Sequence, residues 1–196
     1  MRKLVAAMLC LALSLMCAVG LANEKIDPSE LQIGVIMIGD TSDMGFNYSH
    51  LVGLQEMQKN LGIEDHQITI LENVADDSTC ADAISELISN GCNVIIGNSF
   101  GFQTYMYEAA AQHPEVLFCH YSGLLQNDTN FCRFNARNYQ TRYLQGIAAA
   151  MRSESGKIGF VGAFKNAEVN VSLNAYALGA QSVNPDVTVY VKYTNS

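Results

Sequence analysis

Two short loops in the sequence carry residue types that could do chemistry. The first, residues 97–101, has the letters GNSFG and matches the GxSxG nucleophile elbow of α/β-hydrolases around Ser99. Such an enzyme also needs an acid and a histidine on later strand ends. The only downstream histidines are His113 and His120. The acids that precede them, Glu108 and Glu115, lie in one helix–strand connection and not on a separate strand end. A secreted serine hydrolase using Ser99 is therefore the alternative, and the favoured interpretation is a glycine-framed turn that faces a ligand.

The second loop, residues 40–47, has the letters DTSDMGFN and combines carboxylates, an aromatic ring and an amide. Asp43 can accept hydrogen bonds from the donor groups of a polar ligand, and Phe46 offers a face on which a planar ring can stack. Asn47 can donate and accept, and it can also cap the helix that follows. A capped surface turn with a core phenylalanine is the other interpretation of this loop.

Both loops fall inside a regular alternation of expected strands and helices. Compact apolar runs predict strands at residues 32–38, 67–71, 93–96, 116–118, 131–134, 158–161 and 187–191. Helical spacing of apolar residues predicts helices around residues 51–61, 79–90, 105–112, 143–151 and 172–180, with Ser78 and Thr79 as caps of the second. This alternation predicts an α/β fold with a doubly wound parallel sheet. Ligands bind such sheets outside the carboxyl ends of the strands, where both loops lie.

Composition narrows the class of protein. The chain has 196 residues, 49% of them hydrophobic, and a formal net charge of -8. These values exclude a disordered tail, and the lack of a Lys/Arg cluster argues against a nucleic-acid partner. Neither a CxxC motif nor a Cys/His cluster occurs, so no metal site and no cofactor are expected.

The first residues have the features of a secretory signal peptide. Arg2 and Lys3 precede a charge-free run over residues 4–22, and small residues lie just before Asn23. A retained membrane anchor is the alternative, whereas the lipobox before Cys17 is poor. We therefore expect a signal peptide at 1–22 and a mature chain in the periplasm or cell envelope. In that oxidising compartment the pairing of the four remaining cysteines, Cys80, Cys92, Cys119 and Cys132, is open.

Several long segments together resemble the BMP family, also called PnrA-like or basic membrane proteins. They are IGVIMIGDTSDMGFNYSH, ISNGCNVIIGNSFGF, HPEVLFCHYSG, RYLQGIAAAM, KIGFVGAF and LNAYALGAQSVNPDV. The family consists of substrate-binding proteins of ABC importers for purine nucleosides or nucleobases. The resemblance implies a type I periplasmic-binding-protein fold, in which two Rossmann-like lobes close on a ligand at a hinge. It implies an N-terminal lobe at 23–137 and, at 138–196, the hinge crossing and part of a second lobe that is truncated at its C-terminus.

The resemblance also implies which residues contact the ligand and which proteins are partners. The implied ligand-binding residues are Asp43, Phe46, Asn47, Ser99, Phe100, Glu168 and Asn174. Glu168 is retained in a stretch where relatives carry prolines that this chain lacks. The expected molecule is a monomeric receptor without enzymatic activity, which delivers its ligand to a permease and an ATPase. A ligand-binding sensor that signals without transport is a further alternative.

Overall fold

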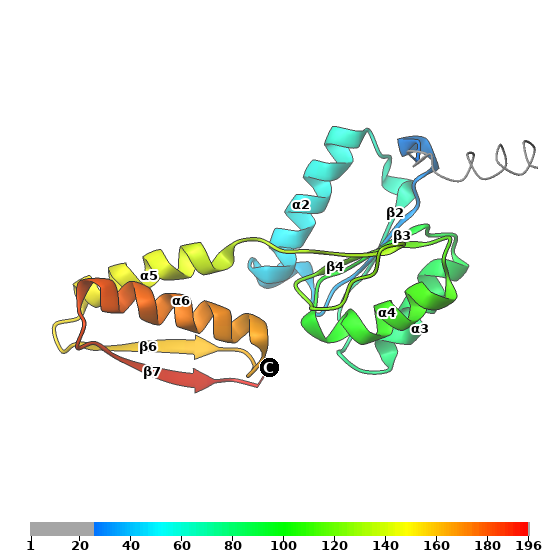
Figure 1. The fold of residues 1–196 in the computed structure, drawn as a ribbon. Coiled ribbons are helices and arrows are strands. Elements are labelled where there is room, and N and C mark those ends of the chain that lie inside the picture. The colour runs from blue at the N-terminus through cyan, green and yellow to red at the C-terminus, as the bar shows by residue number, and fades with distance from the viewer. Residues whose placement is uncertain (1–25, 196) are drawn as a thin grey trace, which may run out of the picture.

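The computed structural model describes residues 26–195, which form two α/β lobes joined through residues 135–137 (Figure 1). The predicted signal peptide at 1–22 lies outside the described residues. The strands are β1 (Ile33–Ile36), β2 (Ile68–Leu71), β3 (Val94–Gly97), β4 (Leu117–Tyr121), β5 (Phe131–Phe134), β6 (Lys157–Gly162) and β7 (Thr188–Tyr193). The helices are α2 (Phe46–Leu61), α3 (Thr79–Ser89), α4 (Gln103–Gln112), α5 (Asn138–Arg152) and α6 (Ala167–Val183). None of the helices in residues 26–195 combines the length and apolar character that crossing a membrane requires.

Lobe one, as we call residues 26–134, is built on a five-stranded parallel sheet in the order β2-β1-β3-β4-β5. Helix α2 packs on one face of this sheet and helices α3 and α4 on the other (Figure 1). Strand β1 is buried at all four positions because it lies between two strands and two helical layers. The continuous apolar run of the sequence is the consequence, since parallel strands covered on both faces have no polar side. The predicted doubly wound sheet is thus confirmed.

Local chemistry explains where the first two helices begin and end. Helix α2 ends at Gly62, whose φ of 67° places it in the left-handed region that glycine adopts without a Cβ penalty. At the start of α3, Asp77 and not Ser78 supplies the capping oxygen, because the Thr79 amide donates to Asp77 Oδ1 at 2.9 Å. The prediction that the Ser78 side chain caps this helix is therefore wrong by one residue.

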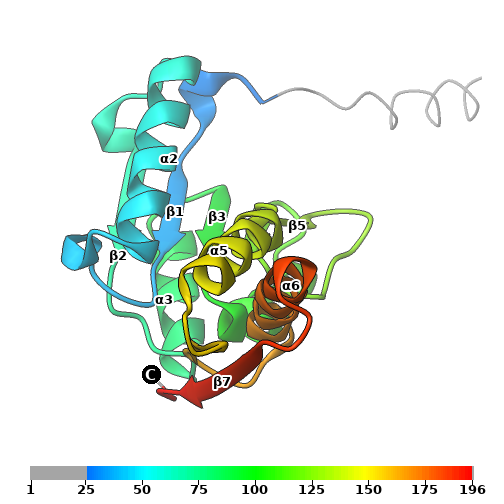
Figure 2. The ribbon, with the colours of Figure 1, turned by 90° about the vertical axis from the view of Figure 1, so that its left-hand side faces the viewer.

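Lobe two, residues 138–195, has a two-stranded parallel sheet of β6 and β7 with helices α5 and α6 on one face (Figures 1 and 2). The two helices approach unusually closely at two glycines. A Cβ on Gly146 would collide with the carbonyl oxygen of Tyr176, and one on Gly179 would collide with that of Tyr143. Backbone-to-backbone packing of α5 on α6 therefore depends on the absence of side chains at these two positions.

The expected elements all occur, and their bounds differ most at the helix starts and at the end of β4, which continues to Tyr121, three residues past the predicted end at 118. The predicted strand 131–134 coincides with β5, whereas α5 and α6 each begin five residues before the predicted 143 and 172. The early turns of both helices carry polar residues, such as Gln140 and Asn170, so that an apolar periodicity does not reveal them. Cap residues mark the start of α6 instead, because Asn166 Oδ1 accepts a hydrogen bond from the Val169 amide at 2.9 Å.

Candidate functional site

A cavity of about 560 Å³ opens between the two lobes, at the carboxyl ends of β1, β3 and β6. It is lined by loop and helix residues from both lobes. From lobe one these are Ile38, Phe46, Asn47, Asp76, Asn98, Ser99, Phe100 and Gly101. From lobe two they are Asn138, Arg142, Phe160, Val161, Gly162, Ala163, Phe164, Asn166, Glu168, Val169 and Ser172. This volume falls within the range of small-molecule sites, roughly 300–1,000 Å³.

Each lobe contributes a half-exposed phenyl ring to this cavity. Phe46 is 43% exposed and Phe164 is 44% exposed, although both are large apolar side chains. The ring of Phe46 is held edge-on by His50 and Tyr121, with centroid separations of 4.8 and 5.8 Å. Burial lowers the pKa of His50, so that this support is an uncharged ring near neutral pH. Both lobes thus contribute exposed aromatic surface, on which a planar ligand could stack, to the lining of the cavity.

A chain of side-chain amides joins the loops that carry these residues. The Asn98 Nδ2 donates to Asn47 Oδ1 at 2.9 Å, and the Ile38 amide donates to Asn98 Oδ1 at 2.9 Å. Both asparagines are buried, so that each of these bonds satisfies a group that water does not reach. The ends of β1, of β3 and the first turn of α2 are consequently fixed relative to one another.

Asp43 does not line the cavity. It lies behind Asn47 and accepts hydrogen bonds from that residue and from the backbone at the start of α2. Its Oδ1 accepts from the Gly45 and Tyr48 amides, and its Oδ2 accepts from the Asn47 amide and Nδ2, all within 3.0 Å. These backbone hydrogen bonds lower the pKa of Asp43 to about 2. The carboxylate also lies at the positive end of the α2 macrodipole. In the described structure, both oxygens of Asp43 are therefore used to hold the loop that presents Phe46 and Asn47.

The GxSxG loop does not have the geometry of a nucleophile elbow. The Ser99 hydroxyl donates to Asp76 Oδ2 at 3.0 Å, whereas His120 Nε2 lies 2.7 Å from the backbone carbonyl oxygen of Ser99. Because a carbonyl only accepts, Nε2 carries the proton, and it holds the loop backbone instead of activating the hydroxyl. Burial also lowers the pKa of His120. The hydrolase alternative is not favoured by this arrangement.

The second glycine of that motif has a packing role. A Cβ on Gly101 would overlap the side chain of Asp76, which comes from the connection after β2. Gly101 therefore allows the carboxylate of Asp76 to reach the Ser99 hydroxyl at the wall of the cavity. The two glycines of the motif thus frame a closely packed turn at the wall of the cavity.

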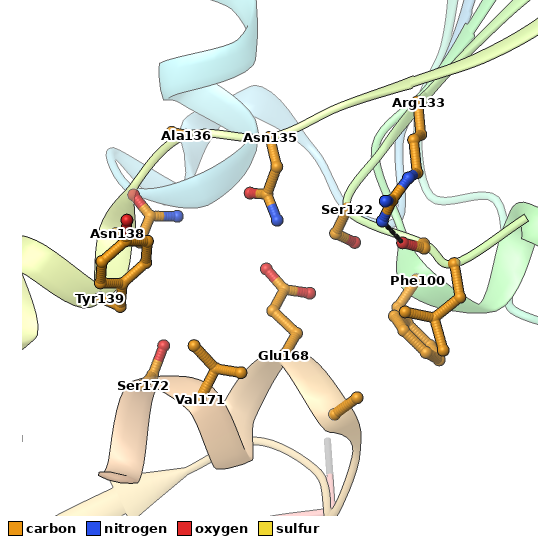
Figure 3. Close-up of a pocket in the computed structure, with 13 residues that line it drawn as sticks. Phe100, Ser122, Arg133, Asn135, Ala136, Asn138, Tyr139, Glu168, Val171 and Ser172 are labelled. Carbon is orange, nitrogen blue, oxygen red and sulfur yellow. Dashed lines mark hydrogen bonds between the residues drawn. The ribbon is translucent and has the colours of Figure 1, made fainter. Parts of the chain in front are cut away.

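A smaller cavity of about 150 Å³ adjoins the first, and the two share Phe100, Asn138, Glu168 and Ser172 among their lining residues. Figure 3 shows the Glu168 side chain pointing from the first turn of α6 toward Asn135, in the connection between the lobes, and toward Ser122 of lobe one. Burial raises the pKa of Glu168. Glu168 is thus a carboxylate of lobe two that faces the end of β4 in lobe one.

The structure brings five of the seven predicted site residues to the larger cavity: Phe46, Asn47, Ser99, Phe100 and Glu168. Asp43 lies behind them, and Asn174 is exposed on α6 outside the lining of either cavity. The individual predictions did not include Asp76, Arg142, Phe164 or Asn166. Asp76 follows β2, Phe164 and Asn166 follow β6, and Arg142 lies near the start of α5. Ligands of such sheets bind at the carboxyl ends of the strands, so these positions could have indicated the residues.

Comparisons with known proteins agree with this architecture. Residues 30–196 match the family described as ABC transporter substrate-binding protein PnrA-like. The chain is 37% identical over 175 residues to a purine-binding protein of Brucella abortus, covering 89% of this chain and 48% of that protein. It is 35% identical to a putative ABC transporter glucose-binding protein of Haloferax volcanii, covering 82% of this chain and 40% of that protein. The chain therefore spans about half the length of the curated relatives it matches.

Solved structures of solute-binding proteins share this fold. The crystal structure of an ABC transporter system solute-binding protein from Aeropyrum pernix K1 superposes with a TM-score of 0.72 at 19% identity, over 84% of this chain and 47% of that one. This likeness concerns the fold alone and agrees with the type I periplasmic-binding-protein architecture. On the match over residues 30–196, the chain belongs to the PnrA-like, or Bmp, family of ABC transporter substrate-binding proteins.

Proposed function

We propose that the chain binds a purine nucleoside or nucleobase in the cavity between its lobes, as part of an extracytoplasmic receptor. The receptor delivers this ligand to an ABC permease and its ATPase and has no catalytic role. The observation that carries the proposal is the pair of half-exposed phenyl rings, Phe46 and Phe164, that line one cavity from different lobes. A planar heterocycle gains apolar burial on such rings, together with about 0.5–1.5 kcal/mol of ring–ring contact.

The polar lining suits the remaining groups of a nucleoside. Asp76 and Glu168 supply acceptors, and Arg142 supplies donors. Asn47 and Asn166 supply amides, which can donate and accept. We propose direct ligand contacts for Phe46, Asn47, Ser99, Phe100 and Glu168, and a positioning role for Asp43. The purine-binding relative in Brucella abortus supports the same class of ligand.

The proposed organisation follows the same reasoning. We propose a signal peptide at 1–22, a first lobe at 23–137 and, at 138–196, the hinge crossing with part of a second lobe. Helix α5 begins at Asn138, and Asn138 Nδ2 donates to the hydroxyl of Tyr121 at 2.7 Å. This hydrogen bond joins the first residue of α5 to the last residue of β4, on either side of the crossing.

Isothermal titration calorimetry of the chain with guanosine, adenine and D-glucose tests the ligand class. We expect heat of binding with guanosine or adenine and none with glucose. The Phe46→Ala variant should weaken both purines by similar factors, about 2- to 10-fold for a lost ring contact. Phe134→Ala is the matched control, because Phe134 is also 43% exposed but does not line the larger cavity.

Two outcomes would overturn the proposal. Binding of glucose in preference to both purines would make the chain a sugar receptor, as the name of the Haloferax volcanii relative suggests for that protein. Unchanged purine affinity in Phe46→Ala would instead make Phe46 a packing residue and move the ligand elsewhere.

A further inference from the structure

Two cysteines lie side by side on neighbouring strands of lobe one. Cys119 in β4 and Cys132 in β5 are register partners in the parallel sheet. Their Sγ atoms are 3.4 Å apart. Paired residues on adjacent strands direct their side chains to the same face of a sheet, so the backbone register itself brings the two sulfurs together.

The strand spacing at this pair is compatible with a disulfide. Neighbouring strands lie about 4.7–4.9 Å apart, within the Cα separations of roughly 4.4–6.8 Å that disulfides span. Closing the bond requires the two Sγ atoms to approach from 3.4 Å to about 2.0 Å, with the register kept. Cys80 and Cys92 differ, because each is buried in the core against α3, and the two occur at opposite ends of that helix.

We propose that Cys119 and Cys132 are a modification site, at which an external disulfide oxidant of the glutathione type forms a reversible disulfide between β4 and β5. The exposed Cys132 thiolate attacks one sulfur of the oxidant, which releases one thiol and leaves a mixed disulfide on Cys132. The Cys119 sulfur then attacks Cys132 Sγ, loses its proton and displaces the second thiol. The two cysteines lose two electrons and two protons in total, and the oxidant is reduced to two thiols.

The surroundings of the two sulfurs give this order of events. Cys132 is exposed, whereas Cys119 is half-buried against the side chains beneath α2. Burial raises the pKa of Cys119 to about 12, with the neighbouring Cys132 acting in the same direction. The thiolate is the attacking form, and a raised pKa leaves little of it on Cys119. Cys119 is therefore assigned to the second step, in which the mixed disulfide on Cys132 is already beside it.

The disulfide would lie close to the connection between the two lobes. Strand β5 is an edge strand that pairs with β4, and it leads through residues 135–137 into α5 (Figure 2). Two residues beyond the cysteine pair, the rings of Tyr121 and Phe134 are in contact, with centroids 5.6 Å apart. A disulfide would hold the edge strand against β4 at the point where the chain leaves lobe one for lobe two.

Peptide mapping by mass spectrometry after treatment of the folded chain with oxidised glutathione tests the proposal. We expect a peptide pair linked through Cys119 and Cys132 that lacks two hydrogen atoms and separates again with dithiothreitol. Cys119→Ser should retain a glutathionyl group on Cys132, and Cys132→Ser should form neither product. Cys80→Ser and Cys92→Ser are the controls and should leave the link intact.

The products found in the parent chain test the proposed disulfide even where a variant fails to fold. A glutathionyl group that persists on Cys132 would show that Cys119 does not resolve it. Free thiols at both positions after full treatment, or a link from either residue to a different cysteine, would also overturn the proposal.

Discussion

The two lobes use the same elements but cover their sheets differently. In lobe one, helices pack on both faces, and β1 is buried at every position. In lobe two, α5 and α6 cover one face, and β6 alternates so that Ile158 and Gly162 are buried while Val161 is 72% exposed. Tyr190 on β7 projects from the same uncovered face and is also exposed.

The two lobes therefore differ in how much buried apolar core they contribute to the stability of the chain. The core of lobe one comprises two clusters, one under each helical layer, whereas lobe two has a single small cluster around Ala180. Both lobes nevertheless contribute loops to the same cavity. We therefore expect substitutions in lobe one to act on global stability and those in lobe two to act on local order.

The largest expected contrast compares two leucines on helices of the two lobes. Leu87→Ala in α3 removes a side chain with no exposed surface, and we expect a loss of about 2–5 kcal/mol in the free energy of unfolding. Leu178→Ala in α6 changes a mostly exposed side chain and should stay within about 0.5 kcal/mol. Urea titration followed by circular dichroism measures both. Equal losses would mean that the outer surface of α6 around Leu178 is covered in solution.

Two glycine-to-alanine substitutions should change the stability of the two lobes in opposite directions. Gly179→Ala in α6 places a methyl group against the carbonyl oxygen of Tyr143, and we expect a destabilisation of about 1–3 kcal/mol, centred on lobe two. Gly53→Ala in α2 meets nothing within 4 Å and should stabilise lobe one by up to about 1 kcal/mol through helix propensity. Thermal unfolding with amide hydrogen exchange locates each effect. A neutral Gly179→Ala variant would contradict the close packing of α5 on α6.

The smallest expected effect concerns the loop beneath the cavity and its dependence on pH. The pKa of Asp43 is lowered in the folded chain from 3.8 to about 2. A group with a lowered folded pKa stabilises the fold above its unfolded pKa, and this contribution is lost as the pH falls through the folded pKa. Asp43→Ala should therefore be less stable than the parent at neutral pH, and the difference should shrink between about pH 4 and pH 2.

Urea midpoints of the parent and Asp43→Ala across that pH range measure the effect. Asp65→Ala is a control, because Asp65 is a surface residue whose carboxylate accepts a hydrogen bond from the side chain of Gln58, whereas Asp43 accepts from backbone amides. A constant difference between the Asp43→Ala variant and the parent down to pH 2 would show that the carboxylate hydrogen bonds are not its cause.

The sequence predicted an element best where a local residue pattern is typical of a single kind of structure. The apolar runs around Val35 and Ile95 predicted the buried strands, and Gly62 predicted the end of α2, because burial on two faces and a left-handed cap each leave a clear trace. Ser99 and Phe46 fell at predicted strand ends and do line the cavity. Phe164 was not named individually, although its loop follows a predicted strand end. Arg142 was missed, because its place in the cavity depends on how two lobes meet across residues 135–137. No periodicity within either lobe encodes that contact.

Hydrogen-exchange mass spectrometry with and without guanosine tests whether one ligand is held by both lobes. We expect slower exchange in the loops at residues 39–47 and 97–102 of lobe one and, together with them, at residues 162–169 of lobe two. Protection confined to one lobe, or no protection at a guanosine concentration far above the titration midpoint, would contradict a site built between the lobes.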